Sequence, residues 1–237
     1  SDESDPVDAP WHRALAASPM IGSGYRIEVS DPQGRFLPVA FDAELPARGL
    51  FNWLAPWISP PQPIALPGGS IASPQMLIER IPLFSAPSRP VPEPLAVVYA
   101  QMREIGVGRA AAWSLLAANI DGMPAGLGMA DGQGRVAVMF PYPEPPRAPL
   151  SSPPEARSDF RWLVDLTAFC TPASPTVAAP DIPDLADVLG QLASPCTVID
   201  SMSSPAVPRR LDYRVPMTAK TEGQPEADAS WLLISTA

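Results

Sequence analysis

Carboxylates are the most numerous residues in this sequence that could do chemistry. Asp42 and Glu44 stand two positions apart, and Asp121 and Asp131 each belong to a turn-like segment. Two carboxyl groups held on either side of a bond can hydrolyse a glycoside, and several together can bind calcium. Acidic residues are equally common in turns that only face water. We therefore keep a hydrolase that uses Asp121 and Asp131 as an alternative and favour a structural role for these residues.

The other nucleophiles and metal ligands form no recognisable site. His12 is the only histidine, and it stands in an acidic, proline-containing segment that is not expected to orient a catalytic partner. Cys170 and Cys196 lack the close spacing of a metal knuckle. We predict two free, buried thiols in a reducing compartment, with a disulfide as the alternative if a leader has been removed. No cofactor, metal or enzymatic activity is expected.

The composition argues against several classes of protein. The 237 residues carry a net charge of −9, and Lys220 is the only lysine, so a broad basic face for nucleic acid is not expected. Apolar runs are too short to insert in a membrane, and the acidic start of the chain is unlike a secretory leader. We therefore predict a cytoplasmic location. Because 34 residues are prolines, long helices are not expected either.

Two turns of nearly the same sequence organise the expected strands. Asp31-Pro32-Gln33-Gly34-Arg35 and Asp131-Gly132-Gln133-Gly134-Arg135 agree at four of five positions, and apolar residues follow each. Aspartate and glycine suit tight turns, because the carboxylate binds nearby backbone and glycine accepts a positive φ. The match favours two hairpins over a repeated domain. The expected structural turn residues are Asp31, Gly34, Arg35, Asp131, Gly134 and Arg135.

Other segments have the two-residue alternation of half-buried strands. It is clearest in the segment 159–170, and the segment 110–120 is read as a strand, with a short helix as the alternative. Asp121-Gly122 is a further turn signal. Strands are expected at 25–29, 36–41, 75–84, 96–105, 110–120, 135–140 and 159–170, with short edge strands around Cys196–Ile199, Tyr213–Met217 and Trp231–Ile234.

One helix is expected, at 182–193. Asp181 can cap it, Pro183 suits its first turn, and apolar residues recur on one face. Between the strands lie proline-rich connectors, which cannot form inner strands because proline lacks the donor that a ladder needs. Large aromatic side chains in these connectors either pin the loops to the sheet or form a docking surface. The interface candidates are Phe51, Trp53, Trp57 and Tyr142.

Four regions follow from these patterns. Residues 1–23 are expected to form a flexible acidic arm, and residues 24–94 a β-hairpin with a proline-rich loop region. Residues 95–170 should contain the β-sheet core. Residues 171–237 should add the short helix and edge strands.

The core region resembles a known family. Leu95-Ala96-Val97-Val98, then Gly108-Arg109-Ala110-Ala111-Ala112-Trp113, then the turn from Gly126 to Val136, with its pattern Gly-x-x-x-x-Asp-x-x-Gly-Arg, are similar to the carboxypeptidase regulatory-like, transthyretin-like domains. The resemblance covers about a third of the chain. It implies a mainly β fold, an antiparallel β-sandwich, here with long proline-rich connectors and one short helix. It also implies a non-catalytic accessory domain.

A second resemblance concerns the setting of the protein. The segments from Arg26 to Phe41, Pro82 to Pro90 and Phe140 to Pro146 are similar to proteins of phage-tail-like contractile injection systems. The sequence thus favours a structural or adaptor protein, such as a cap, baseplate or accessory subunit, whose partners are other protein subunits or copies of itself. The alternative is a carbohydrate-binding module that uses exposed tryptophans.

Overall fold

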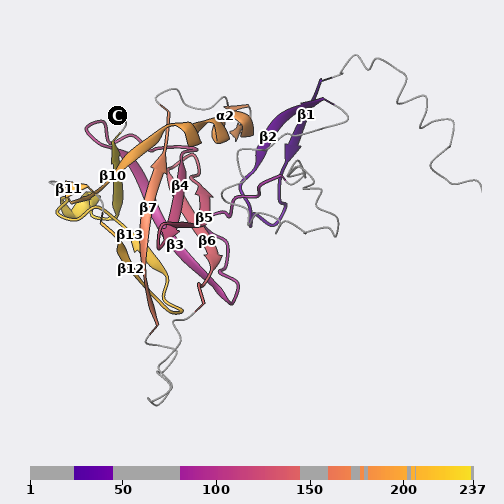
Figure 1. Ribbon diagram of the computed structural model, residues 1–237. Helices are drawn as coiled ribbons and strands as arrows, with labels where there is room; N and C mark the ends of the chain where they lie inside the picture. Colours follow the sequence, from indigo (N-terminus) through magenta and orange to yellow (C-terminus); the bar gives the residue numbers. More distant parts are fainter. Residues whose placement is uncertain are drawn as a thin grey trace, which may run out of the picture.

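The part of the chain that the structure describes folds mainly into β-strands with one short α-helix, which confirms the predicted mainly β class (Figure 1). The computed structural model describes residues 24–44, 81–144, 160–171, 177–178, 181–201, 204–205 and 207–235. The predicted arm, and the interface candidates Phe51, Trp53 and Trp57, lie outside the described residues. Within the described part, no helix combines the length and apolar character needed to cross a membrane.

The described residues contain fourteen strands and one α-helix. The strands are β1 (Gly24–Val29), β2 (Val39–Glu44), β3 (Leu95–Glu104), β4 (Leu115–Ile120), β5 (Met123–Met129), β6 (Arg135–Pro141), β7 (Arg161–Phe169), β8 (Val177–Ala178), β9 (Ile182–Pro183), β10 (Pro195–Ser201), β11 (Ser204–Pro205), β12 (Arg209–Asp212), β13 (Met217–Ala219) and β14 (Trp231–Ser235). The helix is α2 (Leu185–Gly190), and a 3-10 turn at Gln191–Ala193 continues it.

Ten strands form one curled, mixed sheet. Along its main path, β3, β14, β10, β7, β4 and β5 lie side by side in that order. β6 pairs antiparallel with one edge of β3, whereas β13 and β14 pair parallel with the other edge. The sheet therefore differs from the antiparallel arrangement that we predicted. The reason is that the last strands of the chain enter beside β3, a pairing between residues more than a hundred positions apart.

The strands β5 and β6 come together where the sheet curls round. A side chain at Gly126 or Gly128 would press against Val136, Val138 or Phe140 of β6, so glycine allows the two strands to approach closely. The predicted turn at Asp131–Gly134 joins them, but the predicted hairpin is wrong. β5 pairs with β4, and β6 pairs with β3, so this turn is a corner and not the end of a ladder.

The hairpin is found instead one turn earlier. β4 and β5 pair antiparallel about Asp121-Gly122, as that turn signal predicted. The predicted strand at 110–120 is regular only from Leu115, after Trp113 with a φ of 61°. The alternation predicted for 159–170 is confirmed in β7. Of the strand expected at 75–84, only residues 81–84 are described, and they belong to no assigned strand.

Apolar side chains fill the inside of the curl. They come from β3, β4, β6, β7 and the strands near the C-terminus. Burial of this kind contributes about 25 cal/mol per Å² of apolar surface and supplies most of the driving force for the fold. The largest fully buried interior residues are Phe140, Met102, Leu116, Leu211, Leu232 and Ile234.

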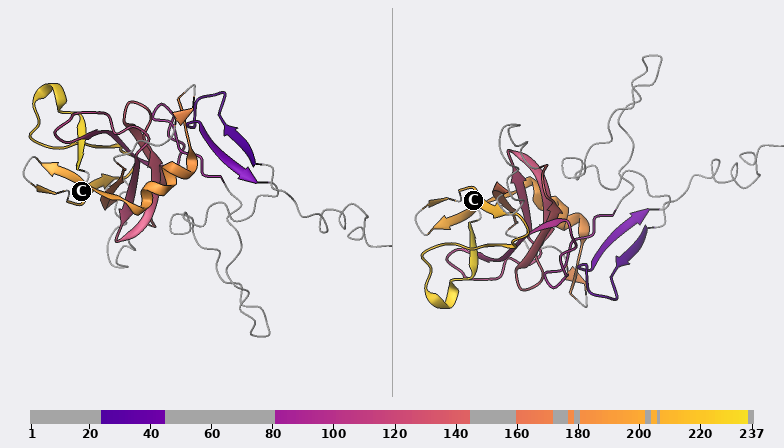
Figure 2. Two further views of the ribbon diagram at one scale, coloured as in Figure 1. Left: turned by 90° about the horizontal axis from the view of Figure 1, so that it is seen from above. Right: turned by 90° about the horizontal axis from the view of Figure 1, so that it is seen from below.

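A second core lies on the outer face of β4 and β5. Leu115 and Met129 of these strands pack with Leu185 and Leu189 of α2. Val39 and Phe41 of β2 join the same cluster, so the β1–β2 hairpin, which was correctly predicted, is held to the body by apolar contacts. Figure 2 shows α2 alongside the sheet with the hairpin beyond it.

The helix begins later than predicted, because a different aspartate caps it. The Asp184 carboxylate accepts bonds from the N–H groups of Ala186 and Asp187, at 2.9 and 3.4 Å. Asp181 instead adopts a φ of 55° in a turn, and Ile182–Pro183 form β9. Asp184 also lies 3.2 Å from the Arg26 guanidinium, which ties the hairpin to the helix.

The two cysteines form a disulfide, so the prediction of free thiols is wrong. Cys170 and Cys196 have an S–S distance of 2.07 Å. They meet because the end of β7 pairs with the start of β10, with Ala168 opposite Cys196. The prediction failed because the two residues are 26 positions apart and only this pairing brings them together. The bond also removes the argument from free thiols on which the predicted cytoplasmic location partly rested.

Candidate functional site

The two similar turn sequences fold in the same way. Asp31 accepts hydrogen bonds from the N–H of Gln33 and from the backbone N–H and Nε of Arg35, each at 3.0 Å. Asp131 accepts the equivalent bonds at 2.8 to 3.0 Å. Gly34 and Gly134 both have a positive φ, of 65° and 78°. The two segments therefore form the same kind of turn.

The electrostatics of the first turn follow from these bonds. The side-chain hydrogen bond from Arg35, followed by the N–H of Gln33, lowers the pKa of Asp31 from its ordinary value of 3.8. A carboxylate with a lowered pKa that is already engaged with its own turn is a poor general acid.

The carboxylate pair considered for hydrolysis is not brought together. Asp121 precedes β5 and Asp131 follows it, so the seven residues of β5 separate them by roughly 20 Å. Glycosidases hold their two carboxyl groups about 5–9.5 Å apart. Asp42, from the other pair, forms an ion pair with Arg26 at 3.3 Å. Among the described residues, no group of three or more His, Cys, Asp or Glu side chains could hold a metal ion.

Tyr142, the fourth interface candidate, belongs to an aromatic cluster. Its ring centroid lies 4.9 Å from that of Tyr213 and 5.3 Å from that of Trp162. Phe160 completes the cluster, at 6.4 Å from both Trp162 and Tyr213. Tilted ring pairs at such distances are favourable beyond their simple burial. The cluster gathers residues from three separate parts of the chain, at one end of the sheet.

A groove opens beside this cluster, where β3 begins and β6 ends. It encloses about 220 Å³. Prolines, apolar residues and the two tyrosine rings line most of it, and one acid and one base stand at its rim. The lining residues of this aromatic groove are Val91, Pro92, Glu93, Pro94, Leu95, Val97, Tyr142, Tyr213, Arg214 and Pro216.

Arg214 holds the polar side of the aromatic groove. Its backbone N–H donates to Tyr142 Oη at 2.8 Å, and its guanidinium lies 5.4 Å from the centre of the Tyr213 ring. The Arg214 side chain is 3.9 Å from Glu93, and both are largely exposed. Burial raises the pKa of Tyr142 while the Arg214 N–H opposes that rise, so the phenol stays protonated at neutral pH.

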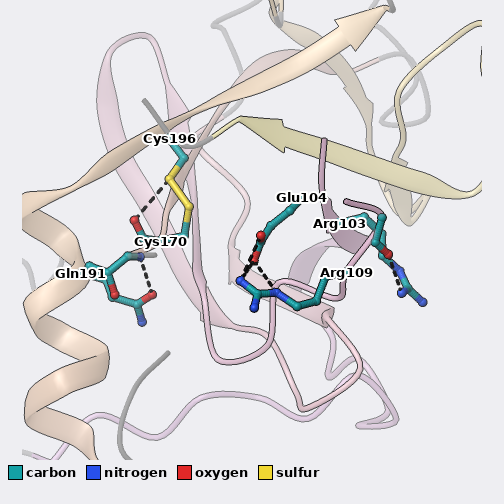
Figure 3. Close-up of polar contacts among 8 residues, drawn as sticks. Arg103, Glu104, Arg109, Cys170, Gln191 and Cys196 are labelled. Atoms are coloured by element: carbon teal, nitrogen blue, oxygen red, sulfur yellow. Dashed lines mark hydrogen bonds and ion pairs between the residues drawn. A yellow bond between two sulfur atoms is a disulfide. The ribbon is translucent and has the colours of Figure 1, made fainter. Parts of the chain in front are cut away.

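The opposite end of β3 carries a second, more polar cavity. It encloses about 240 Å³ between Glu104, Arg109, Ser114, Cys170 and Gln191. The guanidinium of Arg109 donates to both carboxylate oxygens of Glu104, at 2.9 and 3.1 Å. Figure 3 shows this ion pair near the disulfide and Gln191, with Arg103 pointing away.

Gln191, like Glu104 and Ser114, lines this cavity and was not predicted from the sequence as a site residue. Its side chain is buried, and its Nε2 donates to the carbonyls of Trp113 at 2.9 Å and Val188 at 3.3 Å. Its Oε1 accepts from the N–H of Thr171 at 3.3 Å. A single glutamine at the end of an amphipathic segment gives no signal of this role, since two of its partners, Trp113 and Thr171, lie 78 and 20 positions away along the chain.

Comparison with known proteins assigns this chain to no family. No protein-family model, no curated protein and no solved structure matches this chain. The protein is mainly β and has a curled mixed sheet, with an aromatic groove at one end of β3 and a polar cavity at the other.

Proposed function

We propose that this protein is a non-catalytic adaptor that acts by binding other protein subunits. The observation that carries this proposal is the aromatic groove, whose tyrosine rings and prolines offer an apolar surface beside one exposed ion pair. Extended, proline-containing segments dock in grooves of this kind, because they lose little conformational freedom on binding. The partner is thus an extended segment of another protein that carries proline.

Two charged side chains at the rim of the groove can orient a bound segment. Glu93 and Arg214 present opposite charges, with 83% and 64% of their side chains exposed. Because the two charged groups lie only 3.9 Å apart, a bound segment with a basic and an acidic residue close together would meet a complementary charge at each. The disulfide and the two cores support this role, because a rigid groove spends less free energy on ordering when it binds.

The setting that we propose is a larger assembly. The resemblances to transthyretin-like accessory domains and to contractile injection proteins support a cap, baseplate or accessory subunit of a phage-tail-like particle. Light scattering and pull-down with the products of neighbouring genes test this setting. A protein that remains a monomer in both experiments would count against it, and would leave the groove itself open to the separate test below.

The groove is tested with a synthetic polyproline peptide that carries an arginine and a glutamate next to each other. We expect amide shifts in NMR spectra at Glu93, Tyr142 and Arg214, and loss of binding in Val91→Arg, which places a charge on the groove wall. Val107→Arg, the same change on an exposed loop at the other end of β3, is the matched control. Equal binding by both variants would refute the proposal. Groove shifts with a glycan and none with the peptide would favour the carbohydrate-binding alternative.

A further inference from the structure

The polar cavity at the end of β3 has the features of a built site for a small molecule. Cys170 and Ala111 belong to the interior core and also line the cavity, so it is the open end of the curled sheet. Its volume of about 240 Å³ is far above the 10–15 Å³ or so that one water molecule needs. Ends of curled sheets are frequent ligand sites, because strand-connecting loops converge there.

A serine lines this space. Ser114 is only 3% exposed and lines the cavity, and its hydroxyl has no hydrogen-bond partner among the described residues. Ser114 directly precedes β4, whose Leu116 belongs to the interior core. Among the described residues the fully buried side-chain atoms without a partner are Arg103 Nε and Arg209 Nε, so the Ser114 hydroxyl is reached by water and can bond a ligand that enters the cavity.

The mouth of the cavity carries both signs of charge. The Arg109–Glu104 bonds use Nε and Nη2, and Arg109 Nη1 has no hydrogen bond to any described residue. Nη1 is therefore available to a second carboxylate, while the outer side of the Glu104 carboxylate can accept from an ammonium group. A ligand with a single charge would be attracted by one of these two side chains and repelled by the other. In a ligand with both charges, the carboxylate can face Arg109 and the ammonium can face Glu104.

The walls of the polar cavity leave space for a ligand and are fixed by hydrogen bonds and the disulfide. Ala110, Ala112 and Gly132 contribute little side-chain volume. Gln191, with its three hydrogen bonds, and the disulfide at Cys170 fix the opposite wall. A site arranged in advance binds a small ligand at a low cost in ordering.

We propose that this cavity binds a small zwitterion, a molecule with one ammonium and one carboxylate group. The carboxylate accepts from Arg109 and from the Ser114 hydroxyl, and the ammonium donates to Glu104. This site lies at the other end of β3 from the aromatic groove, and it does not rest on the proposed adaptor function.

The test uses L-alanine as the probe, with propionate and ethylammonium as its two single-charge halves. We expect L-alanine to shift the NMR amide signals of Ala111, Ser114 and Gly132 in a saturable way, and each half to bind at least tenfold more weakly. Ser114→Ala should weaken L-alanine about fivefold, the factor expected for one hydrogen bond. Ser88→Ala, a change on an exposed connector, should leave binding unchanged.

A second variant separates the charges. Glu104→Gln should weaken L-alanine while leaving propionate unaffected or tighter, because only the ammonium needs the carboxylate. Absence of saturable shifts with L-alanine, equal binding of its halves, or unchanged binding in Ser114→Ala would each overturn the proposal. A circular dichroism spectrum matching that of the parent protein shows that each variant is folded.

Discussion

The side-chain amide of Gln191 donates a 2.9 Å hydrogen bond to the main-chain carbonyl of Trp113, 78 positions earlier in the chain. Trp113 has a φ of 61°, a conformation that costs a residue with a side chain about 1–2 kcal/mol. The buried amide thus fixes the end of the helical segment to an unusual backbone position just before β4.

Gln191→Ala should lower the free energy of unfolding by about 1–3 kcal/mol, because the carbonyl of the buried Trp113 would lose this donor. Urea unfolding followed by fluorescence measures the change. Gln133→Ala, at an exposed turn position, is the matched control and should stay within about 0.5 kcal/mol of the parent protein. Equal effects of the two changes would show that the amide contributes no stability.

Gly134→Ala should be much more destabilising than Gly122→Ala. Both glycines have a positive φ, so each change carries a similar backbone cost of about 1–2 kcal/mol. A side chain at Gly134 would also collide with the carbonyl oxygen of Met102, whereas Gly122 faces open space. Thermal unfolding of the two variants gives the difference, and similar midpoints would contradict this account of the corner between β5 and β6.

The first turn should weaken in acid. The pKa of Asp31 is lowered in the folded state, so its contribution to stability is present above the ordinary value of 3.8 and is lost as the pH falls through the lower folded value. Carbon-13 NMR of the Asp31 carboxyl group should report a pKa below 3.8. In Arg35→Leu that pKa should rise, because the largest cause of the shift is removed. A pKa that is unchanged in this variant would assign the shift to the backbone donors alone.

The disulfide should contribute about 3 kcal/mol to stability, since it links residues 26 positions apart around the helix-bearing segment. Urea unfolding with and without a reducing agent should show this loss, and the double variant Cys170→Ala with Cys196→Ala should not respond to the reductant. Alkylation followed by mass spectrometry should find no free thiol in the native protein. Two modified cysteines under denaturing, non-reducing conditions would contradict the bond.

Local patterns were enough to predict much of this fold. The Asp-x-x-Gly-Arg turns, the hairpin at residues 24–44 and the alternation in β7 were all recognised from residues that stand close together in the chain. Their geometry depends on short-range hydrogen bonds and on one glycine φ, which a few residues encode almost independently of their surroundings. The helix was placed but its cap was not, because Asp181 and Asp184 are equally good caps in sequence.

The remaining features of the fold depend on pairing between segments that are far apart in the sequence. The parallel entry of β13 and β14 beside β3, the Cys170–Cys196 bond and the Gln191–Trp113 contact join segments far apart in the chain. The aromatic groove likewise combines residues near positions 93, 142 and 214. Such contacts depend on which strands become neighbours in the sheet, and that choice reflects the burial of whole faces more than any local signal. The sequence could therefore predict turns and strands from nearby residues. The groove and the cavity could not be predicted in this way, because they form only when the strands assemble into the sheet.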